Sequence, residues 1–362
     1  MKLDIKQDFV VFLREAFNQT DVVSMASTEK KVYLESNDDG LFIYGCMNDV
    51  GLASRFDATN TVKSRTNGEA FVTERLVKFL TLYRKNFPDN IVLDIQKDAT
   101  VVSIDDKQVL SLNAVEGNVL QYKTFNEELK NPIPYYGIGS VLEKAMSFCD
   151  EIGVRYALNG VLLEQKGNSF NIVGTDGRRM FVNKSEREGQ PFKRIISQRS
   201  LSKMARCLAG DVELYLIDNG LIFKNDVVTI KVISMVGAYP DYEQIAEARG
   251  ERKAKVSKSE LLECITKAST VLNDTSFGGV YLNFNNDSLT VDTDQTEFGK
   301  AIISMLCKYS KPAIKIGFIV KYLMSSFSVI DNDEIELWFN EGTPLTAIDG
   351  NTTILVMPFV KN

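Results

Sequence analysis

The chain contains 362 residues, of which 44% are hydrophobic and 25% charged, as in an ordinary globular protein. This length exceeds the size at which a single hydrophobic core stops growing, so two or three domains are expected. No apolar run approaches the ~20 residues of a membrane span. Because the N-terminus also lacks the apolar core of a signal peptide, we expect a cytoplasmic protein.

Histidine and cysteine usage narrows the chemistry further. The sequence contains no histidine, which removes the commonest general base, the commonest metal ligand and every Ser-His or Cys-His nucleophile. The cysteines are odd in number, far apart and without a C-x-x-C pair: Cys46, Cys149, Cys207, Cys264 and Cys307. They favour reduced, mostly buried thiols over a disulfide or zinc framework. The expectation of catalysis falls accordingly, and neither a cofactor nor a metal site is predicted.

Apolar periodicity and strand propensity predict the first group of elements in chain order. A helix at 7–17 is followed by strands at 31–35, 41–45 and 53–57, a second helix at 73–84, and strands at 90–96, 100–105 and 108–114. The group contains two helices, each followed by strands.

The same order of elements follows twice more, with a period of roughly 120 residues that suits three copies of a small domain. The second copy has a helix at 139–149, a hairpin at 160–164 and 170–173 that precedes the turn Thr175-Asp176-Gly177, a helix at 200–208 stopped by Gly210, and strands at 212–217, 220–224 and 227–235. The third copy has helices at 257–272 and 318–329 and strands at 279–284, 288–293, 300–304, 334–339 and 351–357.

Alternating strands with two helices per copy predict an α+β fold in which antiparallel sheets are each covered on one face by a helix pair. The charged, proline- or glycine-containing stretches 123–134 and 246–255 are interpreted as connectors. The expected domains are therefore 1–124, 125–248 and 249–362. The alternative is three unrelated α+β domains whose patterns agree by chance.

The net charge of −6 argues by itself against nucleic-acid binding, but the uneven distribution of the charges along the chain weakens this argument. Acidic residues gather in strands and turns, whereas the segment from Lys193 to Arg206 contains five cations and no acid. The corresponding segment of copy one also carries more cations than acids. These runs indicate either a basic helix face or ordinary solvated surface.

Three separated motifs together resemble one known family. The residues V-R-Y-x-L-N-G-V-L-L-E at 154–164 precede V-x-T-D-G-x-R-M at 173–180, Tyr239-Pro240-Asp241-Tyr242 follows, and the chain closes with Val356-Met357-Pro358-Phe359. In this order they resemble the bacterial-type β sliding clamp, the DNA polymerase III beta subunit. The divergence from common bacterial clamps makes a phage origin a hypothesis to consider.

The resemblance implies a homodimeric ring of six clamp domains around duplex DNA, without catalysis. Such a ring contacts DNA independently of sequence and tethers a polymerase and a clamp loader through short linear peptides. By this resemblance the protein is nucleoid-associated in the cytoplasm, or in a host cytoplasm if phage-encoded. The DNA-facing residues it implies are Arg75, Lys78, Tyr156, Arg199, Lys203, Arg206 and Lys321.

The resemblance also implies a peptide groove between the second and third domains. Apolar and adaptable side chains would accept Leu and Phe of the peptide, and Arg155 and Arg179 would hold carbonyls or an acid at the rim. Arg178, Gln244 and Phe359 depart from the family pattern. A bulkier Phe359 and an extra cation would reshape the groove and alter the peptide preference. The implied groove residues are Arg155, Leu158, Thr175, Gly177, Arg178, Arg179, Met180, Pro240, Gln244, Ile245, Pro344, Leu345, Met357, Pro358 and Phe359.

Ring closure by the same resemblance sets an edge strand of copy one, with Leu110 and Leu112, against the first helix of copy three, with Val271 and Leu272. Two rival functions stay open. One is a monomeric clamp-like adaptor or decoy that binds clamp-interacting peptides without encircling DNA. The other is a Mg²⁺-dependent nuclease that uses Glu164, Asp176 and Asp241.

Overall fold

The computed structural model of the chain describes residues 1–21, 29–47, 51–125, 128–150, 156–273 and 278–359. These residues form two compact units. Unit 1 comprises residues 1–140 and 199–234, and unit 2 comprises residues 141–198 and 235–362. In the described part of the chain, no helix has both the length and the apolar character needed to span a bilayer.

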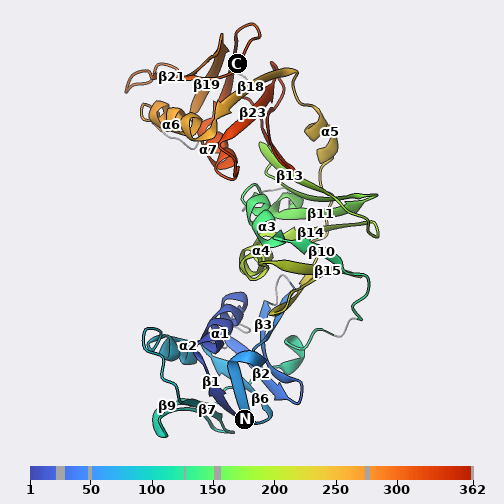
Figure 1. The fold of residues 1–362 in the computed structure, drawn as a ribbon, viewed down its shortest axis with the longest axis vertical. Coiled ribbons are helices and arrows are strands. Elements are labelled where there is room, and N and C mark those ends of the chain that lie inside the picture. The colour runs from blue at the N-terminus through green and yellow to red at the C-terminus, as the bar shows by residue number, and fades with distance from the viewer. Residues whose placement is uncertain (22–28, 48–50, 126–127, 151–155, 274–277, 360–362) are drawn as a thin grey trace. The chain divides into compact units, whose positions relative to one another are not determined.

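Unit 1 contains two antiparallel sheets and a helix pair (Figure 1). The helices are α1 (Gln7–Gln19) and α2 (Glu74–Thr81). The five-stranded sheet has the order β5 (Val62–Thr66), β1 (Lys2–Ile5), β7 (Ile91–Ile95), β8 (Ala99–Ile104), β9 (Lys107–Asn113). The eight-stranded sheet has the order β10 (Ile133–Tyr136), β15 (Asp211–Ile217), β16 (Gly220–Lys224), β17 (Val228–Ile233), β4 (Leu52–Asp57), β3 (Gly40–Met47), β2 (Lys31–Asn37), β6 (Gly68–Thr73).

Helix α1 forms where the sequence places apolar side chains at helical spacing. Phe9, Leu13, Ala16 and Phe17 recur three or four residues apart and are buried. They face β3 and β4, and α2 packs beside α1. Burial of this apolar stripe holds the helix pair on the sheets of unit 1.

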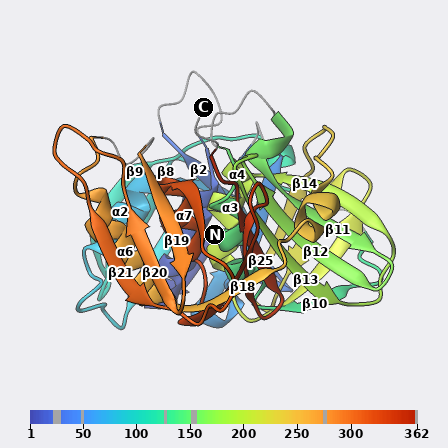
Figure 2. The same ribbon diagram turned by 90° about the horizontal axis from the view of Figure 1, so that it is seen from above.

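Unit 2 repeats this plan with α6 (Lys258–Ser269) and α7 (Val320–Phe327), together with the short helix α5 (Tyr242–Glu247). Its eight-stranded sheet has the order β14 (Phe192–Ser197), β11 (Gly160–Lys166), β12 (Ser169–Thr175), β13 (Arg179–Glu186), β25 (Thr352–Val356), β24 (Leu345–Asp349), β23 (Glu334–Phe339), β18 (Arg252–Ser257). The four-stranded sheet has the order β21 (Ile302–Leu306), β20 (Ser288–Asp292), β19 (Gly279–Asn285), β22 (Ile314–Ile319), of which Figure 2 labels the first three.

Each eight-stranded sheet takes strands from two copies of the predicted repeat. In unit 1 the junction is β4 with β17, where Phe56 lies opposite Val228. In unit 2 the junction is β13 with β25, where Arg179 lies opposite Val356. The strands of copy two are thus divided between the units, and the helices α3 (Ile138–Met146) and α4 (Gln198–Met204) each contain a unit boundary.

The α+β class and the antiparallel sheets are confirmed. The interpretation of 123–134 and 246–255 as connectors is wrong in part, because β10 begins at the end of the first stretch and β18, after the end of α5, begins within the second. Both strands carry charge or proline on the exposed face and apolar side chains on the other, so their composition mimics a linker. The expected boundaries after residues 124 and 248 fall between β9 and β10 and between α5 and β18.

The cysteines of the chain are free thiols, and all but the half-buried Cys207 are buried. Burial raises the pKa of the Cys46, Cys207 and Cys307 thiols to about 11. For Cys149, burial and then the nearby Asp176 carboxylate raise the thiol pKa to about 12. These thiols are accordingly protonated and unreactive near neutral pH.

Candidate functional site

The turn between β12 and β13 is fixed by its own side chains. The Thr175 hydroxyl donates to the Arg179 carbonyl at 2.7 Å and accepts from the Gly177 N–H at 3.0 Å. Asp176 Oδ1 accepts from the backbone N–H groups of Arg178 and Arg179 at 2.8 and 3.0 Å. Gly177 has a φ of +84°, which favours glycine. The turn therefore presents the Arg178 side chain to solvent in a defined place.

Arg179 does not lie at an open rim as predicted. The residue is 8% exposed, and its guanidinium contacts Asp176 Oδ2 at 3.0 Å, the Ser147 carbonyl at 2.6 Å and the Ser325 hydroxyl at 2.5 Å. It also lies over the Phe148 ring, 4.8 Å from the centroid. All these partners are internal, so Arg179 joins the turn to α7 and to the segment after α3. Arg155, the other predicted rim cation, lies outside the described residues.

The C-terminal segment runs beside this turn. The Met357 N–H donates to the Arg178 carbonyl at 2.8 Å, which continues the β13–β25 ladder by one step. Met357 is 39% exposed, and Pro358 is half-buried. Arg178 and Met357 thus form adjacent polar and apolar parts of one surface.

An apolar cluster lies beneath this surface in unit 2. It consists of Leu162, Val173, Met180, Val182, Ile195, Tyr239, Tyr242 and Leu355, with Ala157, Met235 and Ala246 packed against it. The Tyr239 hydroxyl donates to the Val173 carbonyl at 3.0 Å, and the Tyr242 hydroxyl donates to Glu164 at 2.5 Å. Burial is the main cause that raises the pKa of both tyrosines. The floor of the candidate groove is therefore well packed and its polar atoms are satisfied.

Exposed apolar side chains flank the cluster along the chain. Tyr156 is 62% exposed, Val236 is 89% exposed and Ile245 is 41% exposed. Each is the immediate neighbour of a cluster residue, namely Ala157, Met235 or Ala246. Val236 was not predicted from the sequence, and its only signal is a valine beside glycine just after a strand. These side chains and Met357 are exposed apolar groups of unit 2, and such groups can contact partners.

The remaining predicted groove residues divide into buried and exposed members. Leu158, in the 3₁₀ turn Tyr156–Asn159, and Met180 are 3% and 4% exposed, and Pro344 and Leu345 are buried at the start of β24. Pro240 is half-buried before α5, whereas Gln244 on α5 is exposed. The buried members support the surface, and the exposed ones are available to a partner.

Phe359, which was expected to reshape the groove by its bulk, packs on the four-stranded sheet. Its N–H donates to the Gly317 carbonyl at 3.0 Å, and its ring packs on the β19–β22 pair, with its centroid 5.6 Å from that of Tyr281. A Cβ atom built on either Gly279 or Gly317 would come within 2.6 Å of the ring. The ring therefore occupies a seat on the four-stranded sheet.

The predicted DNA-facing cations are exposed or half-buried, but several are paired internally. Arg75 contacts Glu29 at 3.1 Å, Lys78 contacts Glu74 at 3.2 Å, and Arg199 contacts Asp21 at 2.7 Å. Lys203 on α4 and Lys321 on α7 have no acidic partner among the residues that the structure describes. Arg206 is exposed in the 3₁₀ turn after α4. Exposed pairs of this kind are weak and can exchange partners.

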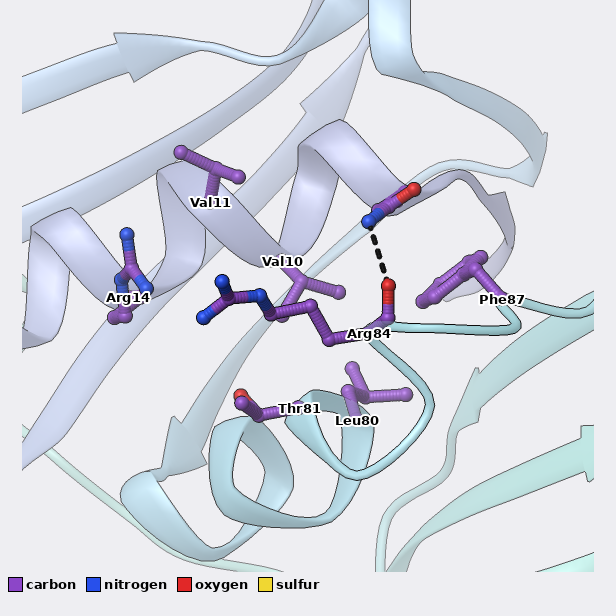
Figure 3. Close-up of a pocket in the computed structure, with 8 residues that line it drawn as sticks. Val10, Val11, Arg14, Leu80, Thr81, Arg84 and Phe87 are labelled. Carbon is purple, nitrogen blue, oxygen red and sulfur yellow. Dashed lines mark hydrogen bonds between the residues drawn. The ribbon is translucent and has the colours of Figure 1, made fainter.

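A cavity of about 230 Å³ lies between α1 and α2 (Figure 3). Val10, Leu80 and Phe87 are among its apolar lining residues, and the Gln7 amide donates to the Arg84 carbonyl at 3.1 Å. The side chains of Arg14 and Arg84 extend toward the same side of the cavity (Figure 3). Arg14 was not singled out from the sequence, because a lone cation on an amphipathic helix carries no distinguishing signal.

The residues predicted at the dimer interface lie on a strand of unit 1 and in the segment after α6. Leu110 and Leu112 are half-buried on β9, which is an edge strand of the five-stranded sheet. The prediction that Val271 and Leu272 belong to a helix is wrong, because α6 ends at Ser269 and the Val271 carbonyl accepts from Thr296 Oγ1 at 2.6 Å. The edge strand β21 carries two further apolar side chains, Ile302 and Leu306, which are 61% and 81% exposed.

The carboxylates of the nuclease hypothesis have structural partners. Asp176 binds the turn and Arg179, and Glu164 contacts Lys193 at 3.4 Å and Tyr242. Asp241 is exposed before α5. Among the described residues, no group of three or more acidic or cysteine side chains is arranged to hold a metal ion.

Comparison with known proteins gives consistent results. A family model described as the DNA polymerase III beta subunit, C-terminal domain, matches residues 247–358. The chain is 21% identical to the beta sliding clamp of Pseudomonas aeruginosa over 288 residues, which cover 76% of this chain and 78% of that protein. It is 24% identical to the beta sliding clamp of Buchnera aphidicola over 272 residues, with 73% and 74% covered.

Solved structures agree over the whole chain. The DNA polymerase III subunit beta of P. aeruginosa superposes with a TM-score of 0.86 at 18% identity, and the Helicobacter pylori beta clamp bound to a DNA ligase peptide with 0.82 at 18%, both covering 100% of each chain. The fold is therefore that of the sliding clamps. The sequence relationships likewise point to the β sliding clamps, at 21% and 24% identity to the two relatives above.

Proposed function

We propose that this protein is a DNA sliding clamp. Two copies close a ring of six domains, three from each chain, with domain limits at 1–124, 125–248 and 249–362. The ring encircles duplex DNA without reading its sequence and tethers a polymerase through a peptide groove. The observation that carries the proposal is the exposed pair Arg178 and Met357, with Ile245 exposed on α5, in a chain similar to the β sliding clamps in sequence and fold.

Peptide binding is supported by the chemistry of that surface. Met357 and Ile245 are exposed apolar side chains, and Arg178 is an exposed cation beside Met357. Methionine adapts to differently shaped partners, and a guanidinium can hold a carboxylate or carbonyl. The H. pylori beta clamp, which shares the fold, was solved with a DNA ligase peptide. We propose that polymerase and clamp-loader peptides bind here.

DNA contact is proposed for the helix faces. Lys203, Arg206 and Lys321 supply cations there, and Arg14 and Arg84 beside the α1–α2 cavity add two more. Phosphate contacts of this type are individually weak and independent of sequence, as sliding requires. Bound to DNA, the protein would be associated with the nucleoid.

Dimerisation is proposed through sheet edges. A strand edge with exposed apolar side chains invites pairing with another chain. Strand β9, with the half-buried Leu110 and Leu112, and strand β21, with the exposed Ile302 and Leu306, are both edge strands of their sheets. A head-to-tail contact between them, made twice and supported by Val271 and Leu272, closes a ring.

Retention on DNA circles tests the proposal. The protein is placed on circular DNA by a matched loader with ATP, or passively at high concentration, and is then washed with salt, which weakens ionic contacts whatever the topology of the DNA. We expect survival on closed circles and loss after linearisation. Equal loss from both forms would overturn the clamp proposal.

One observation favours a second candidate, the monomeric adaptor or decoy. Arg75, Lys78 and Arg199 are all engaged by acidic residues of the same chain, which reduces the positive charge available to DNA. Light scattering at micromolar concentration separates the candidates: a dimer supports the clamp, and a monomer that still binds peptide supports the adaptor.

A further inference from the structure

The last described residues of the chain are attached to two different sheets of unit 2. The Met357 N–H donates to the Arg178 carbonyl beside β13, whereas the Phe359 N–H donates to the Gly317 carbonyl of β22. Pro358 lies between them and restricts its own φ angle. The segment Met357–Phe359 is therefore a short, stiff bridge with both ends fixed.

Two glycines form the seat for the Phe359 ring. Gly279 on β19 pairs with Ile319, and Gly317 on β22 pairs with Tyr281, so the glycines lie diagonally on neighbouring strands. A Cβ atom at either position would lie 2.6 Å from ring carbons, closer than atoms can approach. The ring thus rests on bare backbone, with Tyr281 at its edge.

The backbone itself does not require glycine at these two places. Neither Gly279 nor Gly317 has a positive φ, unlike the turn glycine Gly177. Glycine in a strand lowers its stability and commonly marks the close approach of another group. At Gly279 and Gly317 the approaching group is the aromatic ring of Phe359.

We propose that Phe359 is a positioning residue for the peptide surface. With the ring in its glycine seat, Met357 is held beside Arg178, with its side chain 39% exposed toward a partner. Without the ring, Met357 and Pro358 gain conformational freedom that a bound peptide has to remove again, which weakens binding. This inference rests on the proposed peptide-binding function.

A double-mutant cycle in the full-length chain tests the inference. The probe is a fluorescein-labelled octapeptide that carries one Leu and one Phe, and its Kd is measured by fluorescence anisotropy. We expect Phe359→Ala to weaken binding about three- to tenfold. We expect Gly317→Ala to do the same in the wild-type background, because its Cβ displaces the ring.

In the Phe359→Ala background, Gly317→Ala should have no further effect, because no ring remains to be displaced. General destabilisation of the sheet would instead give additive losses, which would overturn the inference. Phe298→Ala is the matched control: Phe298 is 66% exposed between β20 and β21, and its removal should leave the Kd unchanged.

The controls separate two kinds of failure. If the wild-type protein does not bind the probe, whereas a solved clamp of the family does, the proposed function fails. If the wild-type protein binds and Phe359→Ala binds equally well, the positioning role of Phe359 alone is disproved. Thermal melting accompanies each variant, and Phe359→Ala at the chain end decides the matter if Gly317→Ala does not fold.

Discussion

The backbone carbonyl of Arg178 accepts a hydrogen bond from the N–H of Met357 at 2.8 Å, although 178 residues lie between them in the sequence. This bond places the exposed guanidinium of the β12–β13 turn next to the exposed thioether at the chain end. One surface of unit 2 thereby depends on the correct pairing of β13 with β25.

Met357→Ala is expected to weaken binding of the labelled octapeptide about tenfold. The side chain is 39% exposed, so its loss removes apolar contact with a partner and hardly affects the core. Anisotropy titration measures the effect, and the thermal midpoint should stay within the error of wild type. Val109→Ala, an exposed apolar residue of unit 1, is the control. An unchanged Kd for Met357→Ala would remove this residue from the site.

Arg179→Ala is expected to destabilise unit 2 by about 3 kcal/mol, because it leaves the buried partners of the guanidinium unpaired. Arg179→Lys should recover only a part, since an ammonium cannot reproduce the planar fork. Arg178→Ala, at an exposed position of the same turn, should leave stability unchanged and affect only peptide binding. Urea unfolding followed by Trp338 fluorescence measures the midpoint. Equal midpoints for the alanine variants at 178 and 179 would contradict the structural role of Arg179.

Lys203→Ala combined with Lys321→Ala should reduce retention on DNA circles at moderate salt. The slope of log K against log salt should become shallower, by the amount expected for the loss of about two phosphate contacts per chain. These lysines have no acidic partner among the described residues, so their charge is available to DNA. Arg75→Ala should have a smaller effect, because Glu29 already offsets its charge. Retention is read across a salt series. Equal losses for the lysine pair and for Arg75→Ala would mean that internal pairing does not govern DNA contact.

Ile302→Asp and Leu306→Asp should convert the proposed dimer into a monomer. Both side chains are exposed on β21, so a carboxylate costs little in the free chain but is buried without a partner in a closed ring. Multi-angle light scattering gives the mass, and circular dichroism verifies the fold. Leu82→Asp, an 80% exposed residue next to α2, is the matched control and should remain dimeric. Dimers that persist in both β21 variants would exclude this edge as the interface.

Stability should fall on the alkaline side as buried thiols ionise in the unfolded chain. The pKa of Cys149 is raised from 9.0 to about 12, chiefly by burial. The protonated Cys149 thiol therefore makes its full contribution to the free energy of unfolding below pH about 9. This contribution is lost as the pH rises toward about 12, because the thiol loses its proton at lower pH in the unfolded chain than in the folded one. Cys149→Ala should flatten the decline between pH 9 and 11 in urea unfolding. Parallel pH profiles for the two proteins would refute the assignment to Cys149.

The sequence predicts most of the elements but not how they pair. The hairpin at 160–173 was predicted because polar residues interrupt two apolar runs, and the structure has β11 and β12 there. Strand β13 was missed because Arg178-Arg179 reads as an exposed charged turn. Arg179 is buried only because Ser147, Phe148 and Ser325 reach it from distant parts of the chain. Alternation of apolar side chains indicates a strand and does not name its neighbour.

The candidate site shows the same division. The family motifs located Met180, Arg178 and Met357, and the structure brings these residues to neighbouring strands or turns. They could not show that Phe359 leaves the groove, because its seat is made by the absence of side chains at Gly279 and Gly317. The sequence around Gly279 and Gly317 does not indicate that a ring from a distant part of the chain packs on them.

The division of copy two between two sheets has a consequence for biosynthesis. The eight-stranded sheet of unit 1 cannot be completed until β17 has been synthesised and Val228 pairs with Phe56. The eight-stranded sheet of unit 2 cannot be completed until Val356 of β25 pairs with Arg179. Pairings this distant form slowly and leave strand edges open meanwhile. The middle third of the chain should consequently fail to fold when expressed as an isolated fragment, because each half of it would lack the strands that complete its sheet.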